Sequence, residues 1–355
     1  MLSAVSQNPF HYLWIMRCAG TNIRNNSECK IIPNCPTVNI SPIIELLDES
    51  LFPSVFTNFR RFYGTVFTEI PYYLKEASNK FQEKAQIISR KYPDCSDFFL
   101  TNRRPIGIPV ISSEHTGLID YSRELHSLQL IRSNFEKIAV RTRVPTFDIA
   151  QTPSIETSFR TLVNSLTHED YLFLDIFYLN GVLAQIKLNL DRLIGIARER
   201  TTHIYILNAF EPEDSAHNYG PFLSKYYDLP GFGDFATEKR YPATGGRSTT
   251  KIIRYYQWEK FLLREFSAGT YLAALQLMMS SNYWINHSAH NRSCPACNRL
   301  NLRTVNEGHP YWKQYRILHY LYSILNETQN TYVNTTSAED FDPDGYDVIF
   351  NSTDA

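Results

Sequence analysis

The sequence predicts an α/β protein whose strands pair in parallel. Residues 138–209 alternate strand-like and helix-like segments, and together they form two successive strand-helix-strand units. A parallel connection must cross over the sheet, and intervening helical patterns of about 15 residues are long enough to do so. A (β/α) barrel of TIM type with roughly eight strands fits a chain of 355 residues. An open, doubly wound sheet is the alternative.

Within 138–209, each element has its own pattern. Residues 138–144 alternate apolar and polar side chains before a proline, as a half-buried strand does. Thr152 and Pro153 predict the start of a helix that runs to about residue 166. Residues 171–179 form an apolar run interrupted by Asp175, a helix follows Gly181, and 203–209 is the third strand.

The flanking segments are predicted in the same way. Apolar spacing of three or four residues indicates helices, and short apolar runs indicate strands. A long polar and aromatic connection is expected over 210–241, and Gly231 to Asp234 within it is interpreted as a turn with a solvated carboxylate. The expected strands are 38–47, 106–111 and 250–256, and the expected helices are 73–90, 125–135, 271–279 and 311–325.

Composition describes an ordinary globular protein with a distinct tail. Hydrophobic residues make up 43% of the chain and charged residues 20%. We expect one domain over 1–325, with a Cys/His-containing insertion near 285–300, and a disordered acidic tail over 326–355. The net charge is −1, but no Lys or Arg follows residue 325, so the preceding body is positive. A phosphate-bearing ligand or a nucleic acid is therefore one open partner class, beside a simple mixed surface.

The sequence also predicts a cytoplasmic protein with no membrane segment. It has no run of 18 apolar residues, and the apolar stretch Tyr12–Met16 lacks the flanks of a signal peptide. Six cysteines are too few for a disulfide scaffold at this length.

Polar side chains near the predicted strand ends are the candidate site. In parallel α/β proteins ligands sit at the carboxyl ends of the strands, where the loops converge. The candidate ligand-binding residues are Arg141, Arg143, Asn208 and Arg254, and the candidate catalytic residues are Glu45, Asp175, Glu211 and Asp234. Such carboxylates could hold a metal ion or divide acid and base roles. A purely structural pairing, for example of Asp175 with Arg141, is the alternative for each.

Four residues near the end of the predicted body form a candidate metal site: His287, His290, Cys294 and Cys297. Nitrogen and sulfur donors of this kind are the ligands of tetrahedral zinc. Their spacing is more compact than in most structural zinc sites, and His309 and His319 are substitute ligands. Unligated packing or surface residues are the alternative interpretation.

Four motifs together resemble the Beta family of phage and bacterial proteins over about residues 8–325. They are Ser41–Glu45, Tyr171–Asp175, the segment from Tyr226-Tyr227 to Gly231–Phe235, and the segment from Trp312-Lys313 to His319. The resemblance implies a barrel-like α/β fold and supplies no catalytic residue. Some bacterial members are encoded beside predicted nucleases, which implies a role in conflict between phage and host.

These observations favour a ligand-recognising or sensing protein that acts with a protein partner, with a nuclease as the candidate partner, in defence against phage. A metal-assisted phosphodiesterase or nuclease is the enzyme alternative. A nucleic-acid-binding module is the third. No Gly-x-Ser-x-Gly motif, dinucleotide fingerprint or Walker loop is present to favour another reaction class.

Overall fold

The chain forms a closed barrel of eight parallel strands, which confirms the predicted fold class and excludes the open sheet. The computed structural model describes residues 11–18, 39–47, 59–60, 63–76, 82–102, 107–112, 120–176, 183–209, 215–217, 220–236, 250–257, 262–282, 284, 294–301 and 309–334. The barrel strands, in order around the barrel, are β1 (His11–Cys18), β2 (Ile40–Leu46), β3 (Phe67–Glu69), β4 (Ile108–Ile111), β5 (Ala139–Arg143), β6 (Tyr171–Asp175), β7 (His203–Leu207) and β9 (Gly231–Asp234).

Side chains that alternate along each strand divide between the barrel interior and its outer face. The interior is filled by an apolar cluster to which most of the strands contribute, including Leu13, Ile43, Phe67, Phe173 and Leu207. Phe67 and Phe173 meet edge to face, with ring centroids 5.3 Å apart. The interior is therefore a packed core, and a ligand site inside the barrel is confined to its two ends.

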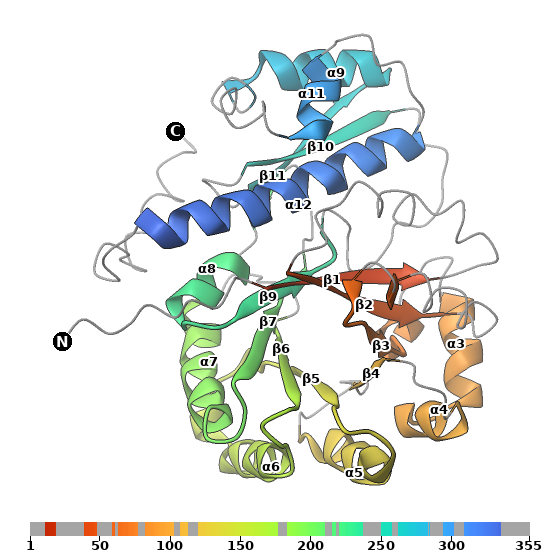
Figure 1. Ribbon diagram of the computed structural model, residues 1–355, viewed down its shortest axis with the longest axis vertical. Helices are drawn as coiled ribbons and strands as arrows, with labels where there is room; N and C mark the ends of the chain where they lie inside the picture. Colours follow the sequence, from red (N-terminus) through yellow and green to blue (C-terminus); the bar gives the residue numbers. More distant parts are fainter. Residues whose placement is uncertain are drawn as a thin grey trace.

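Helices cover the outer face of the barrel from β4 to β7. They are α3 (Gln82–Lys91), α4 (Cys95–Thr101), α5 (Ser122–Ile131), α6 (Pro153–Asn164), α7 (Leu183–Ala197) and α8 (Gly220–Tyr226). Figure 1 shows α4 to α7 around the lower part of the barrel. Their apolar faces share one core with the outward side chains of the strands, such as Val140 and Leu172.

A second group of elements covers the outer face of β1, β2 and β9, and we call it the accessory layer. It consists of an antiparallel sheet, β10 (Lys251–Gln257), β11 (Leu262–Ala268) and β8 (Ser215–His217), with helices α9 (Tyr271–Ser280), α11 (Pro295–Asn301) and α12 (His309–Asn334). In Figure 1, α12 crosses between the barrel and β10 and β11. The outward residues Tyr12, Trp14 and Met16 of β1 are buried in one core with this layer.

The barrel closes through β9, which lies between β7 and β1. Two glycines make this approach possible. A Cβ atom on Gly231 would lie 1.6 Å from the carbonyl oxygen of His11. One on Gly233 would lie 2.7 Å from both Leu13 Cβ and Leu207 Cδ2. Only a residue without a side chain fits at these two positions.

The structure corrects the expectation for 210–241. This stretch holds β8, α8 and the eighth barrel strand, so Gly231 to Asp234 is a buried strand and not a solvated turn. The two glycines, which favour a turn in the sequence, are needed here for close backbone approach. The predicted strand at 250–256 is confirmed as β10, although it pairs antiparallel outside the barrel.

The C-terminal helix is longer than its apolar pattern indicates. It was expected over 311–325, whereas α12 extends from His309 to Asn334. Once a helix is formed, each further residue adds one hydrogen bond for one residue fixed, which is less costly than nucleation, so the backbone can continue past the amphipathic part. The first nine residues of the predicted disordered tail are thus helical, and 335–355 lie outside the described residues.

Within the described residues, no helix combines the length and the apolar character needed to cross a membrane.

We expect Gly233→Ala to destabilise the protein by about 1–3 kcal/mol, because a methyl group would be forced between Leu13 and Leu207. Urea unfolding measures the change. Gly195→Ala is the matched control, since Gly195 lies in α7 with open space around its Cβ direction. That variant should be stabilised by up to about 1 kcal/mol. Equal effects of the two substitutions would contradict the role given to Gly233.

Candidate functional site

Five charged side chains from five strands meet inside the barrel near the carboxyl ends of its strands. All are largely buried: the side chain of Arg17 is 10% exposed, and the other four side chains are at most 5% exposed. We call this group the mouth cluster; it consists of Arg17 (β1), Glu45 (β2), Glu69 (β3), Arg141 (β5) and Asp175 (β6).

Arg141 is the centre of the mouth cluster. Its Nη1 donates to Glu69 Oε2 at 2.7 Å and to Glu45 Oε1 at 3.5 Å. Its Nε donates to Asp175 Oδ2 at 2.8 Å. The side chain of Arg141 is only 4% exposed, so its charge is compensated by carboxylates and hardly at all by water. One guanidinium therefore holds the ends of β2, β3 and β6 in a fixed arrangement.

Arg17 and Tyr73 complete the contacts of Glu45. Arg17 Nε lies 3.1 Å from Glu45 Oε2, and the guanidinium stacks over the ring of Phe235 at 4.2 Å. The hydroxyl of Tyr73 donates to Glu45 Oε1 at 2.7 Å and accepts from Arg17 Nη2 at 3.1 Å. Tyr73 belongs to the 3-10 helix η4 (Tyr72–Glu76), which follows β3.

The electrostatics of the mouth cluster single out Glu69. Burial raises the pKa of the Glu69 carboxyl above its ordinary value; the Arg141 guanidinium opposes this rise and the Glu45 carboxylate adds to it. The cluster contains three carboxyl groups and two guanidinium groups, so it holds one carboxyl group more than the guanidinium charges balance. A carboxyl group whose pKa is raised by burial can take part in proton transfer with a ligand.

The opposite end of the barrel carries a neutral polar cluster. His11 Nδ1 lies 2.9 Å from the hydroxyl of Tyr205, and Nε2 lies 2.9 Å from Ser41 Oγ. Burial, with a smaller contribution from His203, lowers the pKa of His11 to about 4. The imidazole is thus neutral near pH 7, and both of its nitrogen atoms have hydrogen-bond partners within the barrel. This arrangement fits a structural role in closing this end of the barrel.

Several predicted residues do converge at the mouth. Glu45, Asp175 and Arg141 are in direct contact, as described above. Arg143 ends β5 and is in register with Asp175 on β6. Asn208 is buried directly after β7, where its backbone N–H donates to the carbonyl oxygen of Gly233 at 2.9 Å, but the residues that face the barrel interior there are its neighbours Leu207 and Ala209.

Asp234 does not belong to the mouth. Successive residues of a strand point to opposite faces. Because Gly233 faces the barrel interior, the side chain of Asp234 points to the outer face of β9. It accepts hydrogen bonds from the hydroxyl of Tyr12 at 2.5 Å and from that of Tyr320 on α12. Burial raises the pKa of both tyrosines well above the ordinary value, and Asp234 adds to the rise, so both remain donors. Asp234 therefore joins the barrel to the accessory layer.

Arg254 is likewise elsewhere. It lies on β10 of the antiparallel sheet and pairs with Glu265 of β11. Its sequence pattern is that of a strand, but a pattern does not show to which sheet a strand belongs. Glu211, the fourth candidate carboxylate, lies outside the described residues.

Three residues of the site were missed by the sequence reasoning: Arg17, Glu69 and Tyr73. Glu69 ends a three-residue strand, which is too short to show an alternation. Arg17 follows the apolar stretch Tyr12–Met16. If this stretch had been recognised as a strand, Arg17 would have been predicted at the carboxyl end of β1. Tyr73 was assigned to the expected helix 73–90, and nothing in the sequence placed its hydroxyl group near a strand end.

A second candidate site lies in the accessory layer. Cys294, Cys297 and His319 are buried, and one donor atom of each lies within 4.8 Å of the others, so the cluster could hold a metal ion. Cys297 Sγ is 3.1 Å and Cys294 Sγ is 3.7 Å from His319 Nδ1. Hydrogen bonding, first to Cys297 and then to His319, lowers the pKa of Cys294 to about 4, whereas burial raises that of Cys297.

This cluster differs from the predicted ligand set. Cys294 and Cys297 are retained, and His319, expected only as a substitute, takes the place of a nearer histidine. His287 and His290 lie outside the described residues, and so does the side chain of His309. His319 is 22 residues from Cys297, and only the packing of α12 beside α11 brings the two together.

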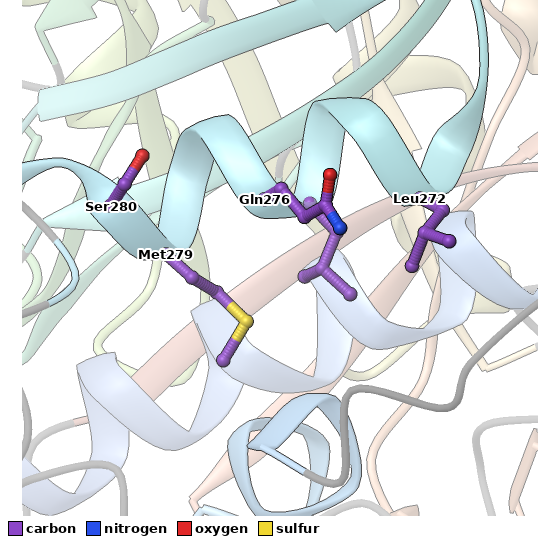
Figure 2. Close-up of a pocket in the computed structure, with 5 residues that line it drawn as sticks. Leu272, Gln276, Met279 and Ser280 are labelled. Atoms are coloured by element: carbon purple, nitrogen blue, oxygen red, sulfur yellow. The ribbon is translucent and has the colours of Figure 1, made fainter.

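A surface pocket of about 310 Å³ lies apart from both sites. It is lined along one face of α9 by Leu272, Leu275, Gln276, Met279 and Ser280 (Figure 2). The lining includes no charged side chain, so it offers neither a metal ligand nor an acid-base group.

Comparison of the chain with protein-family models and with curated proteins gives no match. The resemblance to the Beta family therefore stays a prediction.

We expect Glu69→Gln to change how stability depends on pH. Because the pKa of Glu69 is raised in the folded state, that state binds the proton more tightly than the unfolded state above the ordinary pKa of 4.5. The contribution of Glu69 to stability is therefore largest at low pH and is lost as the pH rises through the raised pKa. The stability of the wild type minus that of Glu69→Gln should decrease from pH 4.5 upwards.

Urea unfolding of both proteins over this pH range measures the difference. Glu83→Gln is the control, since Glu83 is exposed on α3 and should leave the pH dependence unchanged. A stability difference that grows as the pH rises would mean that Glu69 has a depressed pKa, contrary to the burial of its carboxyl group.

Proposed function

We propose that the protein recognises a small polar ligand at the carboxyl end of its barrel. One observation carries this proposal: five buried charged side chains from five strands converge at that end. The layer beneath them is apolar, which demonstrates that side chains such as Phe67 and Phe173 suffice to fill this barrel. Burying a charged network costs desolvation energy that apolar packing avoids, so barrel closure alone gives no reason for it.

The position of the cluster agrees with this function. Barrels of this architecture carry their sites at the carboxyl ends of the strands, which is an argument from fold analogy. The mouth cluster offers guanidinium donors, carboxylate acceptors and the hydroxyl of Tyr73 within one group. This mixture suits a ligand that has both donor and acceptor groups, and a ligand group can replace one of the internal contacts of Arg141.

The enzyme alternative has less support. A metal-assisted phosphodiesterase or nuclease was expected to use Glu45, Asp175, Glu211 and Asp234, yet Asp234 faces away from the mouth. Among the described residues, no three carboxylates of the mouth lie within 4.8 Å of one another. No observation in the described part of the chain favours the nucleic-acid-binding alternative.

The wider setting of this proposal rests on the resemblance to the Beta family. It comprises action with a protein partner such as a nuclease and a role in defence against phage; the proposed cytoplasmic location rests instead on the sequence pattern of residues 1–20. Purification of the protein with its partner from producing cells is the direct test of that setting.

For the accessory layer, the proposed cofactor is zinc. Zinc binds well to two thiolates and an imidazole. Magnesium and calcium, in contrast, are bound by oxygen ligands. A tetrahedral zinc ion with bonds of about 2.3 Å to sulfur and about 2.1 Å to nitrogen separates these donors by roughly 3.6 Å. The separations of 3.1 and 3.7 Å from His319 Nδ1 to the two sulfur atoms are close to that value.

We expect a thermal-shift screen of nucleotides, amino acids, amines and sugars to identify a compound that stabilises the wild type. A ligand at about 100 times its Kd stabilises by about 2.7 kcal/mol, which is a measurable shift in Tm. The shift should disappear in Asp175→Asn, which keeps the size of the side chain but removes the charge facing Arg141.

Glu199→Gln is the control for this screen, because Glu199 is exposed and distant from the mouth. Native mass spectrometry of protein from its own host should show the same compound bound. If the protein instead turns over a substrate and Asp175→Asn abolishes that turnover, the enzyme alternative replaces the recognition proposal.

We expect protein purified without chelator to contain about one zinc ion per chain by elemental analysis. Cys297→Ser should lower this content at least several-fold, because it replaces a soft thiolate with a hydroxyl group. His168→Ala, which changes a histidine whose side chain is 84% exposed, should leave the zinc content unchanged. A wild type that neither contains nor takes up zinc would overturn the cofactor proposal.

A further inference from the structure

The geometry around His319 directs its two ring nitrogen atoms to different partners. Nε2 lies 2.9 Å from the carbonyl oxygen of Tyr256. A carbonyl oxygen can only accept, so Nε2 carries a hydrogen atom, and in the neutral imidazole the lone pair is then on Nδ1. Nδ1 is the atom that faces the two sulfur atoms. A backbone carbonyl that fixes the tautomer of a metal-binding histidine is a usual part of such sites.

The elements that meet at this cluster come from separate parts of the chain and pack in one apolar core. Cys294 precedes α11 and Cys297 lies within it, whereas His319 belongs to α12. A helix of seven residues, as α11 is, does not hold its conformation without tertiary contacts. A metal ion bound by both cysteines and by His319 would therefore connect α11 to α12 by coordination bonds.

The same short stretch of α12 also holds the accessory layer to the barrel. Tyr320 follows His319 and donates to Asp234 on β9, and the Tyr12 hydroxyl of β1 donates to the same carboxylate. The two neighbouring residues of β10 pack against this stretch. Tyr255 stacks on His319 at 4.2 Å, and Tyr256 contacts Tyr320 edge to face at 4.7 Å.

The surface beneath these contacts is strongly apolar. Tyr12, Trp14 and Met16 point outward from β1 and are at most 1% exposed, in one core with α12 and β10. At about 25 cal/mol per Å², covering large side chains of this kind makes a major contribution to stability. The attachment of the accessory layer therefore decides whether this face of the barrel is covered.

We propose that a metal ion of the zinc type, bound by Cys294, Cys297 and His319, fastens the accessory layer to the outer face of β1 and β9. This inference rests on the zinc proposal above and adds a role to it. The ion fixes His319, and the position of His319 fixes that of Tyr320 in its hydrogen bond to Asp234. Because the metal binds the assembled ligands and not the separated ones, its binding free energy stabilises the attached layer.

Hydrogen exchange of the zinc-loaded, full-length protein tests this inference. A strong chelator removes the metal, and elemental analysis before and after treatment measures the zinc content. We expect removal to accelerate exchange at least tenfold in peptides that cover α11, α12 and β10, with a smaller increase in β1 and β9. Peptides from β5 and α6, which lie in the other outer core, should not change. Addition of zinc should restore the original rates.

Two variants separate metal binding from attachment. Tyr320→Phe removes the hydroxyl that donates to Asp234 but no metal ligand, so it should keep its zinc and still exchange faster in β9 and α12. Cys95→Ala changes a buried cysteine on α4 and should affect neither measurement. Both can be compared with the chelated wild type, which needs no substitution to fold.

The outcomes distinguish this inference from the cofactor proposal. If zinc is present and its removal leaves exchange in the accessory layer unchanged, the fastening role is wrong and the zinc proposal stands. If the protein neither contains nor takes up zinc, both are wrong. If removal accelerates exchange equally throughout the barrel, the ion supports the whole fold and the specific role given to it here is overturned.

Discussion

The close approach of β9 to its neighbours is the constraint on which both halves of the structure depend. Gly231 and Gly233 let β9 fit between β7 and β1 and thereby close the barrel. Closure fixes the position of Arg17 at the end of β1, next to Glu45 on β2. It also fixes Asp234 on the outer face, where α12 attaches. Two residues without side chains thus determine the geometry on both faces of the barrel wall.

The mouth and the accessory layer meet at adjacent residues of the chain. Asp234 accepts hydrogen bonds from the hydroxyl groups of Tyr12 and Tyr320. The next residue, Phe235, lies inside the barrel, and the guanidinium of Arg17 stacks over its ring. Arg17 in turn holds Glu45. The alternation of a strand therefore places a contact of the candidate ligand site and a contact of the accessory layer one residue apart.

The sequence predicted the fold class and part of the site because those features follow from local patterns. Alternation and helix periodicity over 138–209 gave β5, α6, β6, α7 and β7, and these strand ends correctly located Arg141 and Asp175. Features set by distant contacts were not predictable in this way. The short strand β9 has the composition of a turn, and the outward direction of Asp234 depends on pairing with β1. Glu69 was missed because β3 is too short to show a pattern.

The pairing of β1 also determines when the protein can fold during its synthesis. The first strand of the barrel needs β9 at its edge and α12 over its outer face, more than 200 and nearly 300 residues further along the chain. Until those segments have left the ribosome, Tyr12, Trp14 and Met16 lack the cover of β9, β10 and α12, which belong to the same buried cluster. Contacts between residues so distant in sequence form slowly during folding. Apolar strands that stay exposed until these contacts form are prone to aggregation. The strand β1 consequently stays exposed to aggregation until α12 has been made.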